Sequence, residues 1–300
     1  MPTISSGSKV QVAYIPEVTA GTTPATPQTI AIPYVKFSAE LDRNTISDPS
    51  RNGDNQKRFM SAGSSKTSGS LEVALSHSQF DPFIEAALMG TWTTNVLKVG
   101  NIQKYFTFEE FDSALSFGRV FTGVEVDSLK LSVKPDATVS AVFALMGRGH
   151  TVVSTSIDVT PTAIIAGKNP MTGALGSLTI NGTAAFVTSV DLSVSNSIKM
   201  INTIGSTAVT ASTNGQKSIT GSLTVLLENA TLYNQFIANT TAALAFTISD
   251  GTNTYTFSVP KCGITKANAS ADSPDERVLS LEFEALYDAT LLSIMSITST

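Results

Sequence analysis

Side chains that usually carry chemistry are scarce in this chain of 300 residues, which has one cysteine and two histidines. The single Cys262 excludes a disulfide framework within one chain, and we interpret it as a small buried hydrophobe. His77 and His150 lie far apart, and no catalytic triad or zinc-ligand spacing can be assembled around them. We interpret both as surface residues, and the adjacent Glu109 and Glu110 as a solvated strand end rather than an acid/base pair. The sequence therefore predicts no enzyme, no cofactor and no metal site.

Charge and long apolar runs are also limited. Only 14% of the residues are charged and the formal net charge is −5, so the chain lacks the basic surface with which proteins hold nucleic acid phosphates. No apolar run approaches the length of a membrane span, and the first residues lack the apolar stretch of a signal peptide. We expect a protein that stays soluble where it is made and has no membrane partner.

What the chain has in abundance is alternating apolar and small polar residues, with 42% hydrophobic residues overall. Such alternation predicts half-buried β-strands. The strands expected on this basis lie at residues 9–15, 29–41, 68–76, 104–110, 118–133, 138–147, 184–195, 221–228, 244–260 and 277–287, the last but one being a hairpin that turns at Asp250 and Gly251. Helical spacing replaces alternation at residues 78–90 and 229–238. The sequence predicts a mainly β protein with two short helices.

The two halves of the chain share a repeated pattern. Residues 67–76, TSGSLEVALS, and 219–228, ITGSLTVLLE, lie 152 residues apart, and ten positions of an ungapped comparison of 34–84 with 186–236 are identical. Near the end of each half, Ser140 and Phe143 align with Ser280 and Phe283 at an offset of 140, so about twelve residues are missing from the second copy, most of them around 109–120. We interpret the chain as a first domain at 1–150, a linker at 151–175 and a duplicated second domain at 176–300.

The first half resembles the tail tube, or major tail, proteins of long-tailed phages. The resemblance rests on VAYIPEVTAGTTPATPQ at 12–28, on SGSLEVALSHSQFDPFIEAALMGTW at 68–92 and on NVLK at 95–98. It covers residues 8–150 well, and the second half mainly through the order of its elements. It implies two tail-tube-type β-sandwich domains, each with one short flanking α-helix, rings stacked into a hollow tube, and no catalytic residues. The implied partners are other copies of the chain, a tape-measure protein in the lumen, terminator and distal tail proteins at the tube ends, and DNA in transit without specific binding. The implied location is the virion tail, after synthesis in the bacterial cytoplasm.

Two long segments of equal length, 44–66 and 196–218, are expected to be the loops by which one ring contacts the next, as the resemblance implies. The first is expected to contribute charged residues, and the second apolar ones that would otherwise form a sticky surface. The predicted contact residues are Asp48, Arg51, Asp54, Lys57, Arg58, Met200, Ile201, Ile204 and Val209. The other interpretation is that the first segment is a solvated loop and the second packs on its own domain.

A duplicated domain predicts rings of three chains with pseudo-sixfold symmetry. A ring of six chains, with the second domain on its outside, remains open, as does a different class of protein, a secreted or surface-displayed β-sandwich adhesion module.

Overall fold

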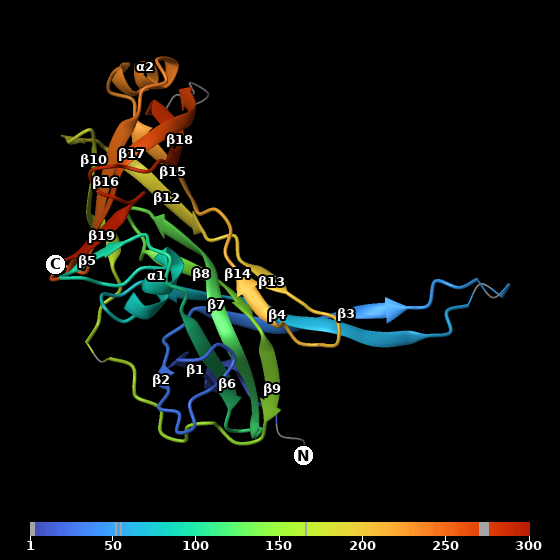
Figure 1. The fold of residues 1–300 in the computed structure, drawn as a ribbon. Helices are drawn as coiled ribbons and strands as arrows, with labels where there is room; N and C mark the ends of the chain where they lie inside the picture. The colour runs from blue at the N-terminus through green and yellow to red at the C-terminus, as the bar shows by residue number, and fades with distance from the viewer. Residues whose placement is uncertain (1–3, 52, 55, 166, 270–275) are drawn as a thin grey trace.

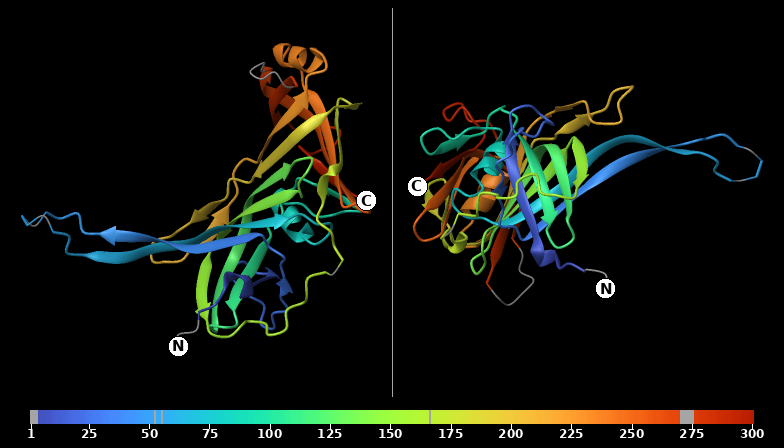
Figure 2. Two further views of the ribbon diagram at one scale, coloured as in Figure 1. Left: turned by 180° about the vertical axis from the view of Figure 1, so that it is seen from behind. Right: turned by 90° about the horizontal axis from the view of Figure 1, so that it is seen from below.

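The computed structural model describes residues 4–51, 53–54, 56–165, 167–269 and 276–300. Over these residues the chain is mainly β, with long antiparallel strands and two short helices, which confirms the predicted β-sandwich class (Figure 1). The strands of the two halves form two lobes, and a long two-stranded arm leaves the molecule from the first half (Figures 1 and 2).

The elements follow in chain order. The first half contains η1 (Gly7–Lys9), β1 (Val10–Glu17), β2 (Ile30–Ala31), β3 (Lys36–Ser47), β4 (Met60–Ala74), α1 (Asp81–Leu88), β5 (Val96–Lys98), β6 (Tyr105–Asp112), β7 (Phe117–Val133), β8 (Ser140–Gly147) and β9 (Gly149–Val153). The second contains β10 (Thr172–Ile180), β11 (Thr183–Ala184), β12 (Val187–Ser195), β13 (Lys199–Ile201), β14 (Ala211–Thr213), β15 (Ser218–Leu226), α2 (Thr231–Ile237), β16 (Ala242–Ser249), β17 (Thr254–Ala269), β18 (Val278–Ala285) and β19 (Ser296–Ser299).

Strand pairing follows the same order in both halves. In the first half the neighbours run β2, β1, β6, β7, β8, β4, β3, and in the second they run β11, β10, β16, β17, β18, β15, β12. β7 and β17 are the longest strands of their halves, and each pairs along different parts of its length with strands on both layers. Each lobe is thus a sandwich whose two layers share one long strand.

The registers also correspond, but at an offset that differs from the one expected. Leu71 lies opposite Phe143 in the first half, and Leu223 lies opposite Leu281 in the second. Residues of β4 are therefore 152 positions from their counterparts in β15, whereas residues of β8 are 138 positions from theirs in β18. The β7–β8 bulge after Val126 recurs 138 residues later, after Ile264. The alignment of Phe143 with Phe283 at an offset of 140 was therefore wrong by one β-repeat, because a slip of two residues preserves the alternation. The second copy is shorter by 152 − 138 = 14 residues.

One continuous sheet crosses the boundary between the halves. Residues 128–133 of β7 pair antiparallel with residues 190–195 of β12, from Ser128 opposite Ser195 to Val133 opposite Val190. The sheet therefore runs through eight strands, in the order β3, β4, β8, β7, β12, β15, β18, β17. We call the β7–β12 pairing the internal seam.

The expected linker at 151–175 is shorter in the structure. β9 extends the first lobe to Val153 and β10 begins the second at Thr172. The connection between them follows the surface of the first lobe, where Asp158 accepts a hydrogen bond of 2.8 Å from the backbone N–H of Thr29. These strand ends escape sequence analysis because their apolar residues are adjacent, as at Val152 and Val153 or Ala174 and Leu175, and do not alternate with polar ones.

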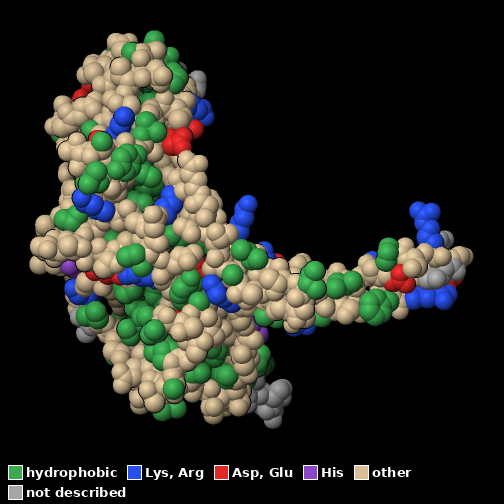
Figure 3. All heavy atoms as spheres, viewed as in Figure 1, with side chains coloured by type: hydrophobic (Ala, Val, Ile, Leu, Met, Phe, Trp, Pro, Cys, Tyr) green, Lys and Arg blue, Asp and Glu red, His purple; other side chains and the backbone are tan. Residues whose placement is uncertain are grey.

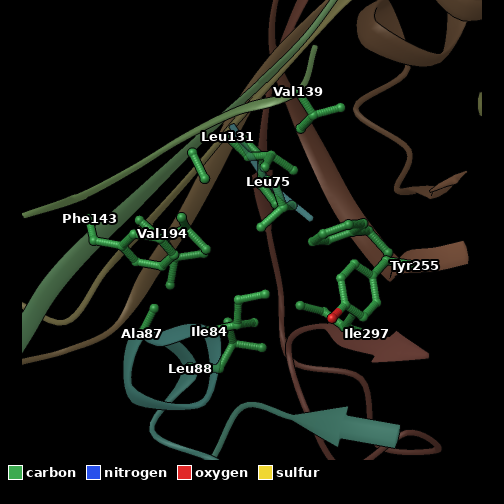
Figure 4. Close-up of a cluster of buried hydrophobic side chains, with 14 of the residues drawn as sticks. Leu75, Ile84, Ala87, Leu88, Leu131, Val139, Phe143, Val194, Tyr255 and Ile297 are labelled. Carbon is green, nitrogen blue, oxygen red and sulfur yellow. The ribbon is translucent and has the colours of Figure 1, made fainter. Parts of the chain in front are cut away.

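Helix α1 is packed in the core, whereas α2 lies near the surface of the second lobe (Figure 1). Five residues of α1 are buried, and none of α2 is. Figure 4 shows Ala87 and Ile84 of α1 below Phe143 of β8 and Val194 of β12, with Leu88 extending toward the side of Ile297. The buried amide of Asn196 also donates to the backbone oxygens of Ala87, at 2.9 Å, and Val126, at 3.1 Å. Both halves of the chain therefore enclose α1.

Candidate functional site

The outward face of the eight-stranded sheet is mainly polar, with apolar Val142 and Ala144 on β8. A hollow on this face extends over β7, β8, β12, β15, β17 and β18. Its polar lining includes Lys130, Ser132, Ser140, Asp191, Ser193, Thr220, Ser222, Thr265, Glu282 and Glu284. The three carboxylates and one ammonium give this lining a net charge of 1 − 3 = −2. The opposite face of the same strands holds the core residues, such as Leu131, Leu192 and Leu223. Alternation along each strand thus separates a core face from a weakly acidic, serine-rich face.

The segment 44–66 is a loop over only about half of its length, contrary to expectation. β3 and β4 continue their pairing outward, with Ser47 opposite Met60, and form the arm seen in Figure 1. Only residues 48–59 form its tip. The strands escaped prediction because both faces of the arm meet solvent, so its residues need not alternate between apolar and polar.

The tip collects the charged residues predicted for the first segment. Asp48, Arg51, Asp54, Lys57 and Arg58 all lie between residues 48 and 58. Arg58 forms an ion pair with Asp54, and this bond lowers the pKa of the Asp54 carboxyl. Hydrogen bonds from Ser50 lower the pKa of Asp48. Lysine and arginine side chains stand out at the end of the arm in Figure 3.

The arm also carries exposed apolar residues, which the sequence analysis did not single out. Phe59 and Met60 have exposed fractions of 55% and 75%, and Ile46 on the facing strand is exposed as well. They lie next to the charged tip on a two-stranded ribbon that has no layer packed against it. Apolar side chains in such a place are typical of a surface that another protein covers.

The segment 196–218 folds into a short hairpin of β13 and β14 beside the base of the arm (Figures 1 and 2). The backbone N–H of Ser65 in the arm donates to the carbonyl of Thr207 in the hairpin, at 2.8 Å. Ile204 is fully exposed and Ile201 is exposed, while Met200 is half-buried. Val209 is already buried within the chain, so its prediction as a contact residue is corrected: no neighbouring molecule is needed to cover it.

A buried polar cluster holds this hairpin against the first lobe. Ser212 of β14 donates to the carboxylate of Glu125 and accepts a hydrogen bond of 2.8 Å from Arg148. The Glu125 side chain is 1% exposed and also lies 3.5 Å from Arg148. Burial raises the pKa of Glu125 despite these partners. Because removing one partner from such a cluster leaves a buried charge unpaired, we expect the hairpin to be held in one position.

The residues considered for catalysis are dispersed. His77 is half-buried, packs against the ring of Tyr255 in a tilted arrangement and lies 2.8 Å from the Ser299 hydroxyl. His150 is half-buried beside Phe121. Both were expected at the surface, and each is instead partly covered by an aromatic ring. Burial lowers the pKa of both imidazoles.

The expectation of a solvated strand end was wrong for Glu109. Its side chain is buried, and its two oxygens accept hydrogen bonds of 2.8 Å from the backbone N–H of Ile157 and the hydroxyl of Ser156. Glu110 forms an ion pair with Arg119. The two carboxylates thus serve different partners, and Glu109 fastens the connection between the halves. Burial raises the pKa of Glu109.

Cys262 is buried, as expected, and burial raises the pKa of its thiol to about 11. Over the described ranges, no group of three or more histidine, cysteine, aspartate or glutamate side chains has a metal-binding arrangement. No helix in the described part of the chain has the length and apolar character needed to cross a membrane. The surfaces that remain as candidates for function are the polar sheet face, the arm and the β13–β14 hairpin.

Comparison with known protein families identifies the family of the chain. A family model described as "Phage tail tube protein" matches residues 7–285. No curated protein sequence matches the chain. The family match extends over both halves, including the arm, the internal seam and α2.

Proposed function

Because the chain belongs to the phage tail tube protein family and is thus a structural subunit of the virion tail, we propose that three copies form a ring with pseudo-sixfold symmetry and that such rings stack into a hollow tube. The observation that supports the ring is the repeated strand order of the two halves, joined edge to edge by the internal seam. One chain then supplies two similar wedges, so three chains supply six. We propose in the same sense that the halves arose by duplication.

The polar face of the eight-stranded sheet would line the lumen of the tube. Closing this sheet into a barrel removes its edges, which would otherwise invite uncontrolled pairing. A serine-rich lining with a net negative charge suits DNA in transit, because like charge repels phosphate over a Debye length of about 8 Å at physiological salt. The same face would contact a tape-measure protein before DNA passes.

The arm and the β13–β14 hairpin would connect one ring to the next. The arm reaches well beyond the lobes (Figure 2), and both elements expose apolar side chains beside charged ones. At the two ends of the tube, terminator and distal tail proteins would occupy the same surfaces. Synthesis would take place in the cytoplasm of the bacterial host before assembly.

Electron microscopy and mass measurement of the purified protein together test this proposal. Negative staining should show rings or hollow tubes, and the mass of isolated rings should be three times 31.5 kDa. A mass of six chains would replace the trimer by a hexamer and leave the tube intact. A protein that stays a monomer at high concentration, with no rings in the images, would contradict the proposed assembly.

A further inference from the structure

We propose that the end of β17 in one copy pairs antiparallel with β3 of a second copy, in the register that β7 and β12 use at the internal seam. This inference rests on the proposed ring and assigns the residues of its subunit contact. Residues 263–269 of β17 pair with β18 along one edge, and β3 pairs with β4 along one edge; within the described residues no strand pairs with the other edge of either. A side chain does reach β3, since Arg119 donates a hydrogen bond of 3.0 Å to the Ala39 carbonyl, and a strand of a second copy would have to replace this contact. The eight-stranded sheet therefore has one open edge at each end.

The two open edges are the counterparts of the two strands that meet at the internal seam. β7 corresponds to β17 with an offset of 138, since their bulges coincide. Gly69 of β4 and Gly221 of β15 are counterparts at the offset of 152. Ala39 lies opposite Gly69 and Leu192 opposite Gly221, so β3 corresponds to β12 with an offset of 153. This differs by one from the offset of the neighbouring strands, because β12 has an irregularity between Val187 and Ser189.

Transferring the seam register gives specific pairs between copies. The seam pair Leu192 and Leu131 corresponds to Ala39 of one copy opposite Ala269 of the other. The seam pair Val194 and Leu129 corresponds in the same way to Leu41 opposite Ala267. The seam pair Ser195 and Ser128 corresponds to Asp42 of one copy opposite Lys266 of the other. Apolar positions thus meet on the core face of the sheet.

On the polar face, the transferred register places opposite charges together. Within the single chain Asp42 pairs with Lys66 at 3.8 Å and Lys266 pairs with Glu282 at 2.9 Å. The side chains of Asp42 and Lys266 are nevertheless 56% and 65% exposed, so both are accessible to a neighbour. Directly opposite cross-strand positions have Cβ atoms about 4.5–5.5 Å apart, within reach of an ion pair. Electrostatic complementarity of this kind selects register more than it adds affinity.

The exposure of α2 agrees with the same contact. α1 and α2 end in the same backbone turn, with the N–H of Met89 bonded to the Ala86 carbonyl and the N–H of Asn239 to that of Phe236. At this offset of 150, buried Ala87 corresponds to Ile237, which is 67% exposed. α1 is covered by β12 of the other half of the chain, whereas α2 has no such cover. A second copy paired through β3 would supply it.

The residue of β3 that replaces Asn196 in this register is Arg43. Asn196, directly after β12, donates to the carbonyls of Ala87 and Val126, and the counterparts of these two are Ile237 and Ile264. Arg43 is exposed in the single chain. A guanidinium placed there would donate to the last turn of α2, where the helix dipole favours a cation.

Cysteine cross-linking of assembled protein tests the register. The double variant Asp42→Cys/Lys266→Cys should form disulfides between neighbouring copies, giving multiples of 31.5 kDa on non-reducing gels that end at the number of chains per ring. Disulfides require Cα atoms about 4.4–6.8 Å apart. Within one chain the two residues are separated by seven strand spacings of about 4.8 Å each, so a bond between copies is the one expected. Buried Cys262 should not take part.

Two matched variants control the experiment. Ser128→Cys/Ser195→Cys places the same bond at the internal seam and should yield oxidised monomer. Asp42→Cys/Asn268→Cys shifts the register by two residues and should cross-link at least tenfold less. A charge exchange that keeps the ion pairs within the chain provides a second test. Asp42→Lys/Lys66→Asp or Lys266→Asp/Glu282→Lys alone should reduce ring yield severalfold, and the two exchanges together should restore it.

The outcomes separate the subunit contact from the tube itself. Well-formed tubes whose Asp42→Cys/Lys266→Cys chains remain monomeric on gels would overturn the contact and leave the tube subunit intact. Equal cross-linking of the shifted variant, or failure of the double charge exchange to restore rings, would overturn the register. Absence of rings from the unaltered protein would overturn the proposed assembly.

Discussion

Gly69 and Gly221, the two glycines of the repeated Gly-Ser-Leu motif, stand where a neighbouring strand approaches too closely for a side chain. A Cβ at Gly69 would lie 1.8 Å from the backbone oxygen of Ser38, and one at Gly221 would lie 2.6 Å from that of Asp191. Real Cβ atoms do not approach backbone oxygens so closely, so β3 or β12 would have to shift. The repeated glycine therefore has the same physical reason in both halves.

Replacing Gly69 with alanine should destabilise the unassembled subunit by about 1–3 kcal/mol, the usual cost of forcing extra volume into a packed site. Gly263→Ala is the matched control on another strand, because a Cβ there meets nothing within 4 Å. Denaturant unfolding followed by circular dichroism measures both variants. Equal midpoints for the two would show that β3 accommodates the methyl group without loss.

Half-buried His77 should make the subunit less stable in acid. Burial lowers its pKa, with a contribution from nearby Lys168, while Asp81 and Asp250 oppose the change. The unfolded imidazole then takes up a proton first as the pH falls, so the contribution of His77 is complete above about pH 6.5 and is lost as the pH falls through the folded pKa. Half-buried Asp81 and buried Glu109 and Glu125 have raised pKa values and act with the opposite sign.

His77→Gln should therefore lose less stability between pH 8 and pH 5 than the unaltered chain, with His150→Gln as a second imidazole variant for comparison. Thermal unfolding at half-unit steps of pH measures the difference curve, in which the carboxylates cancel. Parallel curves for His77→Gln and the unaltered chain would exclude His77 as a source of acid sensitivity.

At the scale of elements, the β13–β14 hairpin separates side chains with an internal role from those available to a neighbour. Val209 belongs to the chain's own packing, whereas Met200, Ile201 and Ile204 remain at least partly exposed. Replacing these three with serine should give folded rings that stack poorly, because each large apolar side chain buried between rings contributes about 1.5–3 kcal/mol.

Sedimentation of assembled material compares this triple variant with Val159→Ser. Val159 is 83% exposed but lies on the connection between the lobes, so its replacement should leave tube length unchanged. Full-length tubes from the triple variant would remove the hairpin from the ring-to-ring contact.

The arm should contribute to stacking through both apolar and charged side chains. Phe59→Ser/Met60→Ser should shorten tubes at any salt concentration, because burial of these side chains does not depend on ionic strength. Added salt should weaken the part due to Arg51, Lys57 and Arg58, since exposed ion pairs contribute only about 0 to 1 kcal/mol each and are screened. Tube length measured by electron microscopy at 50 mM and at 500 mM salt separates the two. Unchanged length in both comparisons would exclude the arm.

For the whole molecule, the sign of charge on the polar sheet face should control the passage of DNA. Asp191→Lys/Glu284→Lys changes the net charge of the lining from −2 to +2. Tubes of this variant should retain short DNA at low salt and release it as salt rises, because counterion release makes such binding salt-dependent. Asp136→Lys/Glu228→Lys makes the same change in charge away from this hollow. Equal DNA retention by both variants would place the lumen elsewhere.

Local patterns in the sequence determined most elements of this protein. Alternation located the main strands, the helix expected at 78–90 is α1 at 81–88, and the turn at Asp250 and Gly251 joins β16 to β17. Gly251 has a φ of +94°, a conformation that glycine adopts without strain. The residues that decide such features are neighbours in the chain, so sequence alone suffices for them.

Only the tertiary structure decided which strands meet. The internal seam joins residues about 60 positions apart, and nothing in the local pattern of β7 or β12 indicates a partner in the other half of the chain. The arm was hidden because strands exposed on both faces lose the apolar alternation, and Glu109 because its burial depends on Ser156 and Ile157 in a distant segment. Alternation repeats every two residues, so it cannot distinguish an offset of 138 from 140; the hydrogen-bonded register, set by packing across the sheet, does.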